Sequence, residues 1–312
     1  KVNIIMIPSA KTIEATCASE NNLLIIDEAH HKNAPTWNAL EEKLECNKIL
    51  YLTATPSEIM DDKIPIFKKS YTELAELGYL VPPVYERVLT KIQYALNTRG
   101  GDFTYKSLNK LNNPERNEIV AKRWLDNKAK YGKTLVFVAT VAHAESLYAL
   151  IKKKHADTHV IVGTTRNRDK ILEEYEKTPA SCPTILITVN VFVEGTDVPS
   201  VKSIFICRPT LSSVLYVQMI GRGSRLFENK DKYYIVDFVD AVKKYEMRAA
   251  EMFCESMREE YLDDETKELL SRDEKNDFLK QQVKKTPQTL SISPEQLDDL
   301  IGIGFWKNKF AK

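Results

Sequence analysis

Short runs of apolar residues alternate with amphipathic stretches over the first 69 positions of the chain. The runs are short and continuous, as in buried strands, whereas the stretches between them repeat their apolar positions at helical spacing. The expected strands are Val2–Ile7, Leu23–Ile26 and Lys48–Leu52, and the expected helices are residues 11–20 and 36–45. Continuous apolar strands that alternate with helices indicate a parallel sheet covered on both faces.

The same alternation returns at residue 114 and continues to residue 240. The expected strands are Thr134–Val138, His159–Val162, Thr184–Thr188, Ser203–Cys207 and Tyr233–Phe238, and the expected helices are residues 115–131, 142–154, 167–177 and 212–220. The sequence therefore predicts a second parallel sheet and an α/β fold class.

The alternation is interrupted between these two regions. A short helix is expected over Tyr71–Leu77, Gly78 ends it, and Pro82-Pro83 imposes extended chain. Residues 98–113 are polar and are expected to form a surface loop or short helices. The predicted order is a partial first domain, a linker and connecting segment, a second domain, and a charged helical C-terminal extension: residues 1–69, 70–113, 114–240 and 241–312.

The composition is that of an ordinary globular protein. Of the 312 residues, 43% are hydrophobic and 29% are charged, and the net charge is +1. This charge decides nothing about nucleic acid, because main-chain amides and a few side chains suffice to bind a phosphate backbone. The 5 cysteines are scattered and odd in number, and no apolar run is long enough to span a membrane. We therefore expect an intracellular protein, cytoplasmic or nuclear, with no membrane partner.

The sequence Asp27-Glu28-Ala29-His30, here named the acidic box, directly follows an expected strand. Two carboxylates at the carboxyl end of a parallel strand lie where open α/β folds bind ligands. Phosphoryl transfer to water needs one carboxylate that holds Mg²⁺, usually through water, and a second that orients the attacking water. Asp27 suits the first role and Glu28 the second. The alternative is an acidic turn with a capping Asp.

A second motif, Leu52-Thr53-Ala54-Thr55-Pro56, ends the next expected strand and is named the threonine segment. Its two hydroxyls, on Thr53 and Thr55, could relay contacts between a nucleotide site and a nucleic-acid track. By itself the segment is better explained as a strand-to-turn transition.

Two motifs in the second half suit a nucleotide. Glu194-Gly195-Thr196-Asp197 follows the strand at 184–188; Gly195 permits close backbone approach, and Asp197 can bond a ribose hydroxyl or nearby arginines. Gln218–Arg225, named the arginine turn, carries Arg222 and Arg225 beside two glycines. Guanidinium groups on such a turn suit the γ-phosphate. A solvated arginine pair at a helix end is the alternative.

Other features carry no site. Gly132-Lys133-Thr134 resembles the end of a phosphate loop, but it precedes a strand instead of following one. The histidines outside the acidic box lack metal-ligand spacing and are expected on the surface or in local packing.

In order, these motifs resemble those of superfamily 2 helicases and translocases. The acidic box resembles motif II, the threonine segment motif III, Thr134–Thr140 motif IV, Ile187–Pro199 motif V and the arginine turn motif VI. Gly78–Pro83 and Arg208-Pro209-Thr210 are similar to the branch of type I and III restriction-enzyme motor subunits and bacterial repair helicases.

The resemblance implies two RecA-like domains with ATP and Mg²⁺ in the cleft between them. Arg222 and Arg225 would reach the nucleotide as arginine fingers, and Gln218 would face it near His30. Nucleic acid, DNA in preference to RNA, would pass near Thr188. Residues 241–312 match no module and could bind a protein partner.

The phosphate loop of this family, motif I, has no counterpart in the sequence, because no glycine precedes Gly78. We therefore expect a first domain shortened at its N-terminus and a chain that is inactive by itself. An ATPase-inactive module that binds nucleic acid or a partner, and one part of a split motor, are the alternatives.

Overall fold

The computed structural model describes residues 23–29, 48–53, 67, 69, 71–88, 90, 96–100, 102–189 and 198–238. The chain forms two compact units, Lys1–Lys68 and Lys69–Lys312. No helix within the described ranges has the length and apolar character needed to cross a membrane.

Unit 1 is described around one pair of parallel strands, β1 (Leu23–Ile26) and β2 (Lys48–Tyr51). The pairing continues past both strands, because the Leu52 amide donates to the Ile26 carbonyl (2.8 Å) and the Ala29 amide donates to the Leu52 carbonyl (3.0 Å). Two of the expected strands are thus confirmed as parallel neighbours. The expected strand at 2–7 and the helices at 11–20 and 36–45 lie outside the described residues.

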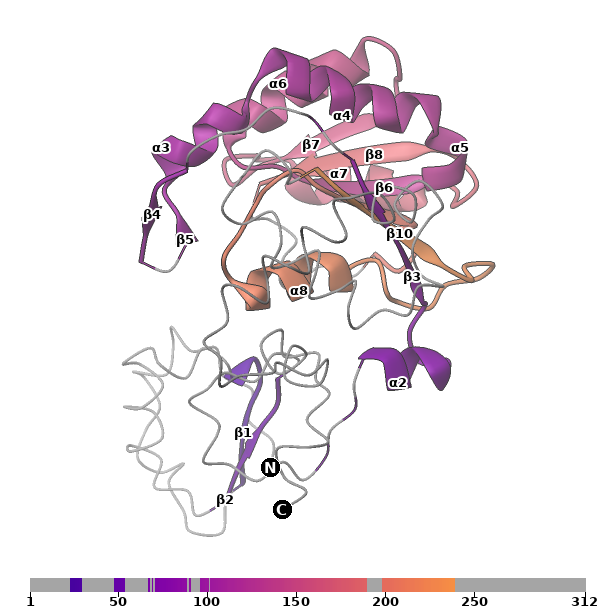
Figure 1. Ribbon diagram of the computed structural model, residues 1–312. Helices are drawn as coiled ribbons and strands as arrows, with labels where there is room; N and C mark the ends of the chain where they lie inside the picture. Colours follow the sequence, from indigo (N-terminus) through magenta and orange to yellow (C-terminus); the bar gives the residue numbers. More distant parts are fainter. Residues whose placement is uncertain are drawn as a thin grey trace, which may run out of the picture. The chain divides into compact units, whose positions relative to one another are not determined.

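Unit 2 is built on a six-stranded sheet in which every neighbouring pair is parallel (Figure 1). The strand order is β3-β10-β9-β6-β8-β7. The bounds are β3 Pro83–Arg87, β6 Lys133–Phe137, β7 Thr158–Ile161, β8 Thr184–Thr188, β9 Ser203–Ile206 and β10 Tyr233–Asp237. The predicted second parallel sheet is confirmed, and β6, β8, β9 and β10 are buried along their whole length.

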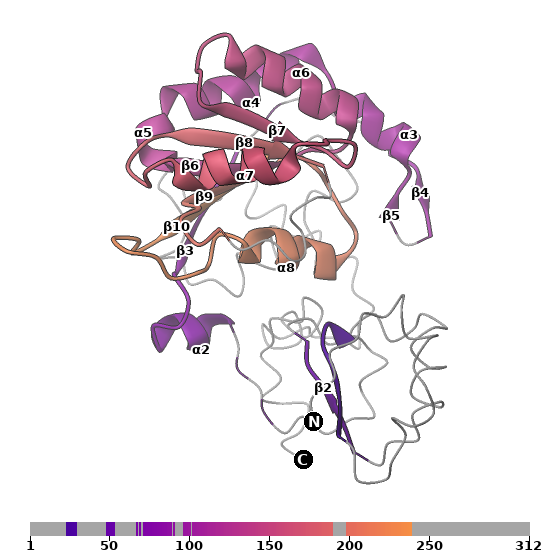
Figure 2. The same ribbon diagram turned by 180° about the vertical axis from the view of Figure 1, so that it is seen from behind.

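Helices cover both faces of this sheet, as Figures 1 and 2 show from opposite sides. One face packs against α4 (Pro114–Asp126), α5 (Lys128–Tyr131) and α6 (Val141–Lys152), with Trp124 and Leu147 in its core. The other face packs against α7 (Arg168–Lys177) and α8 (Ser213–Gly221), with Tyr175 and Met219 in its core. Burial on both faces explains why the central positions of these strands are mostly apolar.

The connecting segment contributes more to unit 2 than its sequence suggests. Residues 83–87, within the segment read as a linker, form the edge strand β3. A proline is tolerated there because an edge strand leaves one row of amide positions without a sheet partner. The segment also contains α2 (Tyr71–Glu76), the short hairpin of β4 (Thr98–Arg99) and β5 (Asp102–Phe103), α3 (Tyr105–Leu108) and the 3₁₀ helix η5 (Asn109–Leu111).

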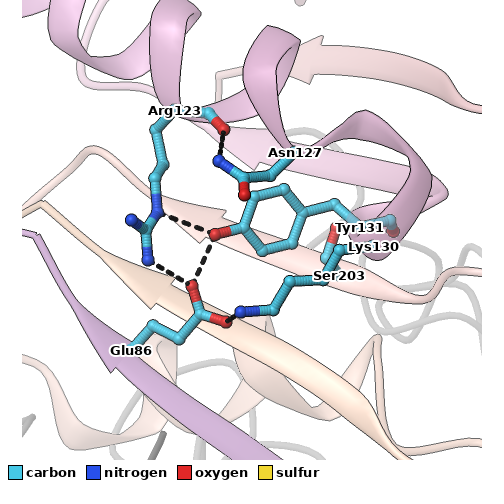
Figure 3. Close-up of polar contacts among 6 residues, drawn as sticks. All are labelled: Glu86, Arg123, Asn127, Lys130, Tyr131 and Ser203. Atoms are coloured by element: carbon cyan, nitrogen blue, oxygen red, sulfur yellow. Dashed lines mark hydrogen bonds and ion pairs between the residues drawn. The ribbon is translucent and has the colours of Figure 1, made fainter. Parts of the chain in front are cut away.

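A buried carboxylate attaches β3 to the helical layer (Figure 3). Glu86 on β3 is 0% exposed; its Oε2 lies 2.9 Å from Arg123 Nη2, and its Oε1 lies 2.7 Å from Lys130 Nζ. The Tyr131 hydroxyl donates to Oε2 and accepts from Arg123 Nε at 2.8 Å. Burial and the Glu86 carboxylate raise the pKa of the Tyr131 hydroxyl far above its usual value, so it remains a donor.

A second buried ion, Arg116, links the carboxyl ends of β9 and β10. Arg116 is 0% exposed, and its Nη2 donates to the carbonyl oxygens of Cys207 (3.0 Å) and Phe238 (2.9 Å), which directly follow β9 and β10. His143, also 0% exposed, accepts a hydrogen bond from the Ala139 amide through Nδ1 (3.5 Å). Burial, together with the charge of Arg116, lowers the pKa of His143 to about 3.

We expect Glu86→Gln to lower the free energy of unfolding by about 3 kcal/mol, because two cations lose their buried counter-charge. Lys130→Met is the matched control: the Lys130 side chain is 37% exposed, so its loss should cost less than about 1 kcal/mol. Urea unfolding followed by tryptophan fluorescence measures both, since Trp124 is buried in this core. Equal losses in the two variants would contradict the assigned role of Glu86.

We expect His143 to make stability depend on pH below about 6.5. Its pKa is about 3 in the folded chain, so between these values the unfolded state binds more protons. The free energy of unfolding should therefore fall as the pH falls, by up to about 1.4 kcal/mol per pH unit from this group. Urea unfolding at several pH values should show a shallower dependence in His143→Gln, and imidazole NMR shifts should show a neutral ring at pH 5. A protonated ring at that pH would disprove the prediction.

Candidate nucleotide site

The acidic box leaves β1 at its carboxyl end, as the sequence predicts. Asp27 is exposed and Glu28 is half-buried, while Ala29 is fully buried against the sheet. The Glu28 amide donates to Asp27 Oδ1 at 2.9 Å, so the Asp27 carboxylate also shapes the turn. The two carboxylates thus lie at the sheet edge, and Asp27 accepts from the amide of the next residue.

Glu28 has a backbone conformation that is unusual for its residue type. Its φ is +50°, in the left-handed region that non-glycine residues rarely adopt. Such backbone strain persists only where surrounding interactions impose it, and it concentrates at functional sites. Here the Ala29 amide is fixed to the Leu52 carbonyl and the Glu28 amide to the Asp27 carboxylate. These two hydrogen bonds hold the Glu28 backbone in a defined position.

The threonine segment begins beside the acidic box. The Leu52 amide and carbonyl are bonded to Ile26 and Ala29, so half-buried Thr53 starts at the same sheet edge as Asp27 and Glu28. Parallel pairing explains this proximity, because it aligns the carboxyl ends of β1 and β2. The neighbouring site residues His30 and Thr55 lie outside the described residues.

The carboxylates of the acidic box suit Mg²⁺ better than a metal ion that is coordinated by protein side chains alone. Among the described residues, no group of three or more His, Cys, Asp or Glu side chains could hold an ion. Mg²⁺ does not require such a group, because it is commonly bound by one or two carboxylates together with water and substrate phosphates. An exposed Asp27 at the sheet edge fits that pattern.

The arginine turn in unit 2 ends helix α8. The Ser212 hydroxyl caps the helix by accepting from the Leu215 amide. Gln218, Arg222 and Arg225 are each half-buried, with Gln218 on the helix and both arginines beyond its last residue.

Gly223 permits the arginine turn to pack directly on the sheet. A Cβ atom at this position would lie 2.3 Å from Tyr233 Cδ2 and 3.1 Å from Ile204 Cγ1. The next residue, Ser224, accepts a 2.7 Å hydrogen bond from the Val81 amide through its carbonyl. The turn between the two arginines is therefore fixed on the sheet by close contact and by a backbone bond.

Asp102 positions the entry to helix α8, a role that sequence reasoning missed. Its Oδ1 accepts from the Leu211 amide (2.9 Å), and its Oδ2 accepts from the Thr210 hydroxyl (3.0 Å) and from Arg208 Nη2 (3.4 Å). The Arg208-Pro209-Thr210 segment was recognised from its sequence, but its partner lies more than a hundred positions earlier. The one local signal was an acidic residue directly after Gly100-Gly101 in a polar stretch.

Of the remaining predicted site residues in unit 2, Thr188 is described by the structure, whereas Gly195 and Asp197 are not. Thr188 ends β8 and is fully buried, with its carbonyl accepting from the Val138 amide at 3.0 Å. Its predicted contact with nucleic acid stays a prediction. Gly195 and Asp197 lie outside the described residues, and the structure resumes with Val198.

Two family models match the chain. Residues 103–227 match the helicase conserved C-terminal domain, and residues 1–58 match the type III restriction enzyme res subunit. The first match runs from the end of β5 to two residues beyond the arginine turn. The second contains both the acidic box and the threonine segment.

Individual relatives are likewise a candidate helicase and a restriction-enzyme subunit. The chain is 30% identical over 239 residues to IRC3 of Saccharomyces cerevisiae, described as a candidate ATP-dependent helicase, and covers 34% of that protein with 70% of its own length. It is 37% identical over 123 residues to the endonuclease subunit of the type I restriction enzyme EcoKI of Escherichia coli, a match covering 35% of this chain and 10% of that subunit. The chain thus spans about a third of IRC3 and a tenth of the EcoKI subunit.

A solved structure shares the fold. A fragment of a candidate HsdR subunit of a type I restriction enzyme from Vibrio vulnificus YJ016 aligns with a TM-score of 0.58 and 24% identity, over 72% of this chain and 44% of that one.

We expect Gly223→Ala to lower the free energy of unfolding by about 2 kcal/mol, because the added methyl group overlaps the Tyr233 ring. Gly221→Ala is the matched control. Gly221 is the last residue of α8, and a Cβ there meets nothing within 4 Å, so stability should stay unchanged or rise by up to about 1 kcal/mol. Thermal or urea unfolding measures the pair, and a harmless Gly223→Ala would refute the close packing.

Proposed function

We propose that this protein, which belongs to the superfamily 2 helicases and translocases, is a nucleic-acid-dependent ATPase that couples ATP hydrolysis to movement along nucleic acid. The observation that supports this most is the geometry of the acidic box. Two carboxylates follow a parallel strand, the second is held at a positive φ, and Thr53 lies at the same sheet edge.

The catalytic roles follow from the chemistry of each side chain. Asp27 would hold Mg²⁺ through water, and Glu28 would orient and deprotonate the water that attacks the γ-phosphate. Arg222 and Arg225 would stabilise the charge that develops on the transferred phosphoryl group. The assignment of these arginines to the same nucleotide rests on the family resemblance and on the fixed turn that carries them.

The remaining roles concern binding and coupling. Gln218, Gly195 and Asp197 would contact ATP, and His30 would couple the site to the second domain. Thr53 and Thr55 would relay the state of the nucleotide to a nucleic-acid track that passes near Thr188.

We favour DNA over RNA as the track, because the relatives include an endonuclease subunit of a type I restriction enzyme. Nucleic acid would be bound mainly through its phosphates, which explains why a net charge of +1 is no obstacle. Residues 241–312 remain a proposed docking segment for a protein partner.

The test is phosphate release with and without single- and double-stranded DNA and RNA. It should be run on this chain and on an N-terminally extended version that supplies a phosphate-binding loop. We expect nucleic acid to stimulate the extended version and to leave this chain nearly inactive. Robust release from this chain would refute the expected need for the loop.

In the extended version, Glu28→Gln should lower kcat by about a hundredfold or more while ATP affinity is retained, because the substitution removes the base but leaves the fold. Glu145→Gln, on the exposed side of α6, is the matched control and should keep wild-type turnover. Normal turnover by Glu28→Gln would disprove the role of Glu28. An extended version that binds nucleic acid without any ATPase activity would instead favour an inactive binding module, and activity restored only by a separate chain would favour a split motor.

A further inference from the structure

We infer that Lys230 is a positioning residue that ties the end of motif V to the end of the arginine turn. The lysine lies beyond every motif recognised in the sequence, in the loop between α8 and β10. The inference deepens the proposed function and rests on it as far as ATP turnover is concerned. The structural tie itself can be tested separately.

The backbone of this loop directs Lys230 toward motif V and the arginine turn. The Lys230 amide donates to the Phe227 carbonyl at 3.2 Å, which closes a tight turn. Asn229, the residue before Lys230, has a φ of +58°, a left-handed conformation that Asn tolerates better than most residues. The turn thereby reverses the chain after the arginine turn and before β10.

The Lys230 ammonium group then joins two segments that are distant in sequence. Its Nζ donates to the carbonyl oxygen of Pro199 at 2.9 Å and to the carbonyl oxygen of Arg225 at 2.9 Å. It also lies 6.0 Å from the centre of the Tyr233 ring. Pro199 comes two residues after the predicted ATP contact Asp197, and Arg225 is the second predicted arginine finger.

Lysine suits this position because it provides several donors on a long stem. The two carbonyl groups belong to loop backbone, so a donor from outside the sheet has to satisfy them. Burial, together with the charge of Arg225, lowers the pKa of Lys230 to about 7. The residue is half-buried, and its ammonium group bonds to the two carbonyl groups instead of extending into solvent.

The tie acts at the Arg225 end of the arginine turn, beyond the residues that pack on the sheet. Gly223 and Ser224 are fixed by Tyr233 and by the Val81 amide. Lys230 Nζ binds the Arg225 carbonyl and the Pro199 carbonyl, so it links the residues that follow Asp197 to the end of the arginine turn. A displacement of about 1 Å in a catalytic group can lower the reaction rate about a hundredfold. Loss of this tie is therefore expected to slow ATP turnover.

The tie is tested first on the chain as given, by amide hydrogen exchange of the wild type and Lys230→Met. Methionine keeps the length of the side chain and removes its donors. We expect exchange to become about tenfold faster or more in both 198–202 and 222–227, with β6 and β8 unchanged. Lys232→Met, an exposed lysine two residues away, should behave as wild type. No change in either segment, or equal loosening of β6 and β8, would overturn the tie.

The catalytic consequence is tested on the N-terminally extended version. Because arginine fingers act mainly in the transition state, Lys230→Met should lower kcat by about tenfold or more and change the KM for ATP by less than about threefold. Lys230→Arg keeps donors and charge and should recover most of the lost turnover. Wild-type kcat in Lys230→Met would refute the positioning role. An extended wild type without nucleic-acid-stimulated turnover would refute the proposed function, while hydrogen exchange still decides the tie.

Discussion

Parallel hydrogen bonding between strands is the constraint on which this molecule depends. Parallel pairing aligns the carboxyl ends of neighbouring strands, so the loops that follow them gather at one edge of a sheet. In unit 1 it brings the acidic box and Thr53 together, through backbone bonds between Ile26, Ala29 and Leu52. In unit 2 it places the end of β8 beside the end of β6 at one sheet edge.

Two buried ions and one half-buried lysine then fix parts of unit 2 that strand pairing alone does not position. Glu86 holds the edge strand β3, Arg116 closes the ends of β9 and β10, and Lys230 binds two loop carbonyls. A buried charge is costly unless it is paired or fully hydrogen-bonded, so each of these groups is stabilising only in one arrangement of its partners. These groups therefore favour one arrangement of β3, of the ends of β9 and β10, and of the loop that carries Lys230.

Sequence reasoning succeeded where local pattern and burial coincide. The strand at 184–188 was predicted to the residue, because each of its positions is apolar or small and is buried. It failed where a contact between residues far apart in the sequence determines the local structure. The helix expected over 115–131 is two helices that meet at Asn127, whose side chain bonds the Arg123 carbonyl while Tyr131 turns in toward Glu86.

The sequence by itself determined the α/β class, the order of the motifs and the position of the two carboxylates after a strand. Apolar periodicity and turn residues are local properties, and they suffice for those conclusions. Only the tertiary structure decided that β3 belongs to the second sheet, that Asp102 holds the entry to α8 and that Lys230 joins Pro199 to Arg225. Those contacts link positions far apart in the chain, and they join polar groups that only the folded sheet brings together out of water.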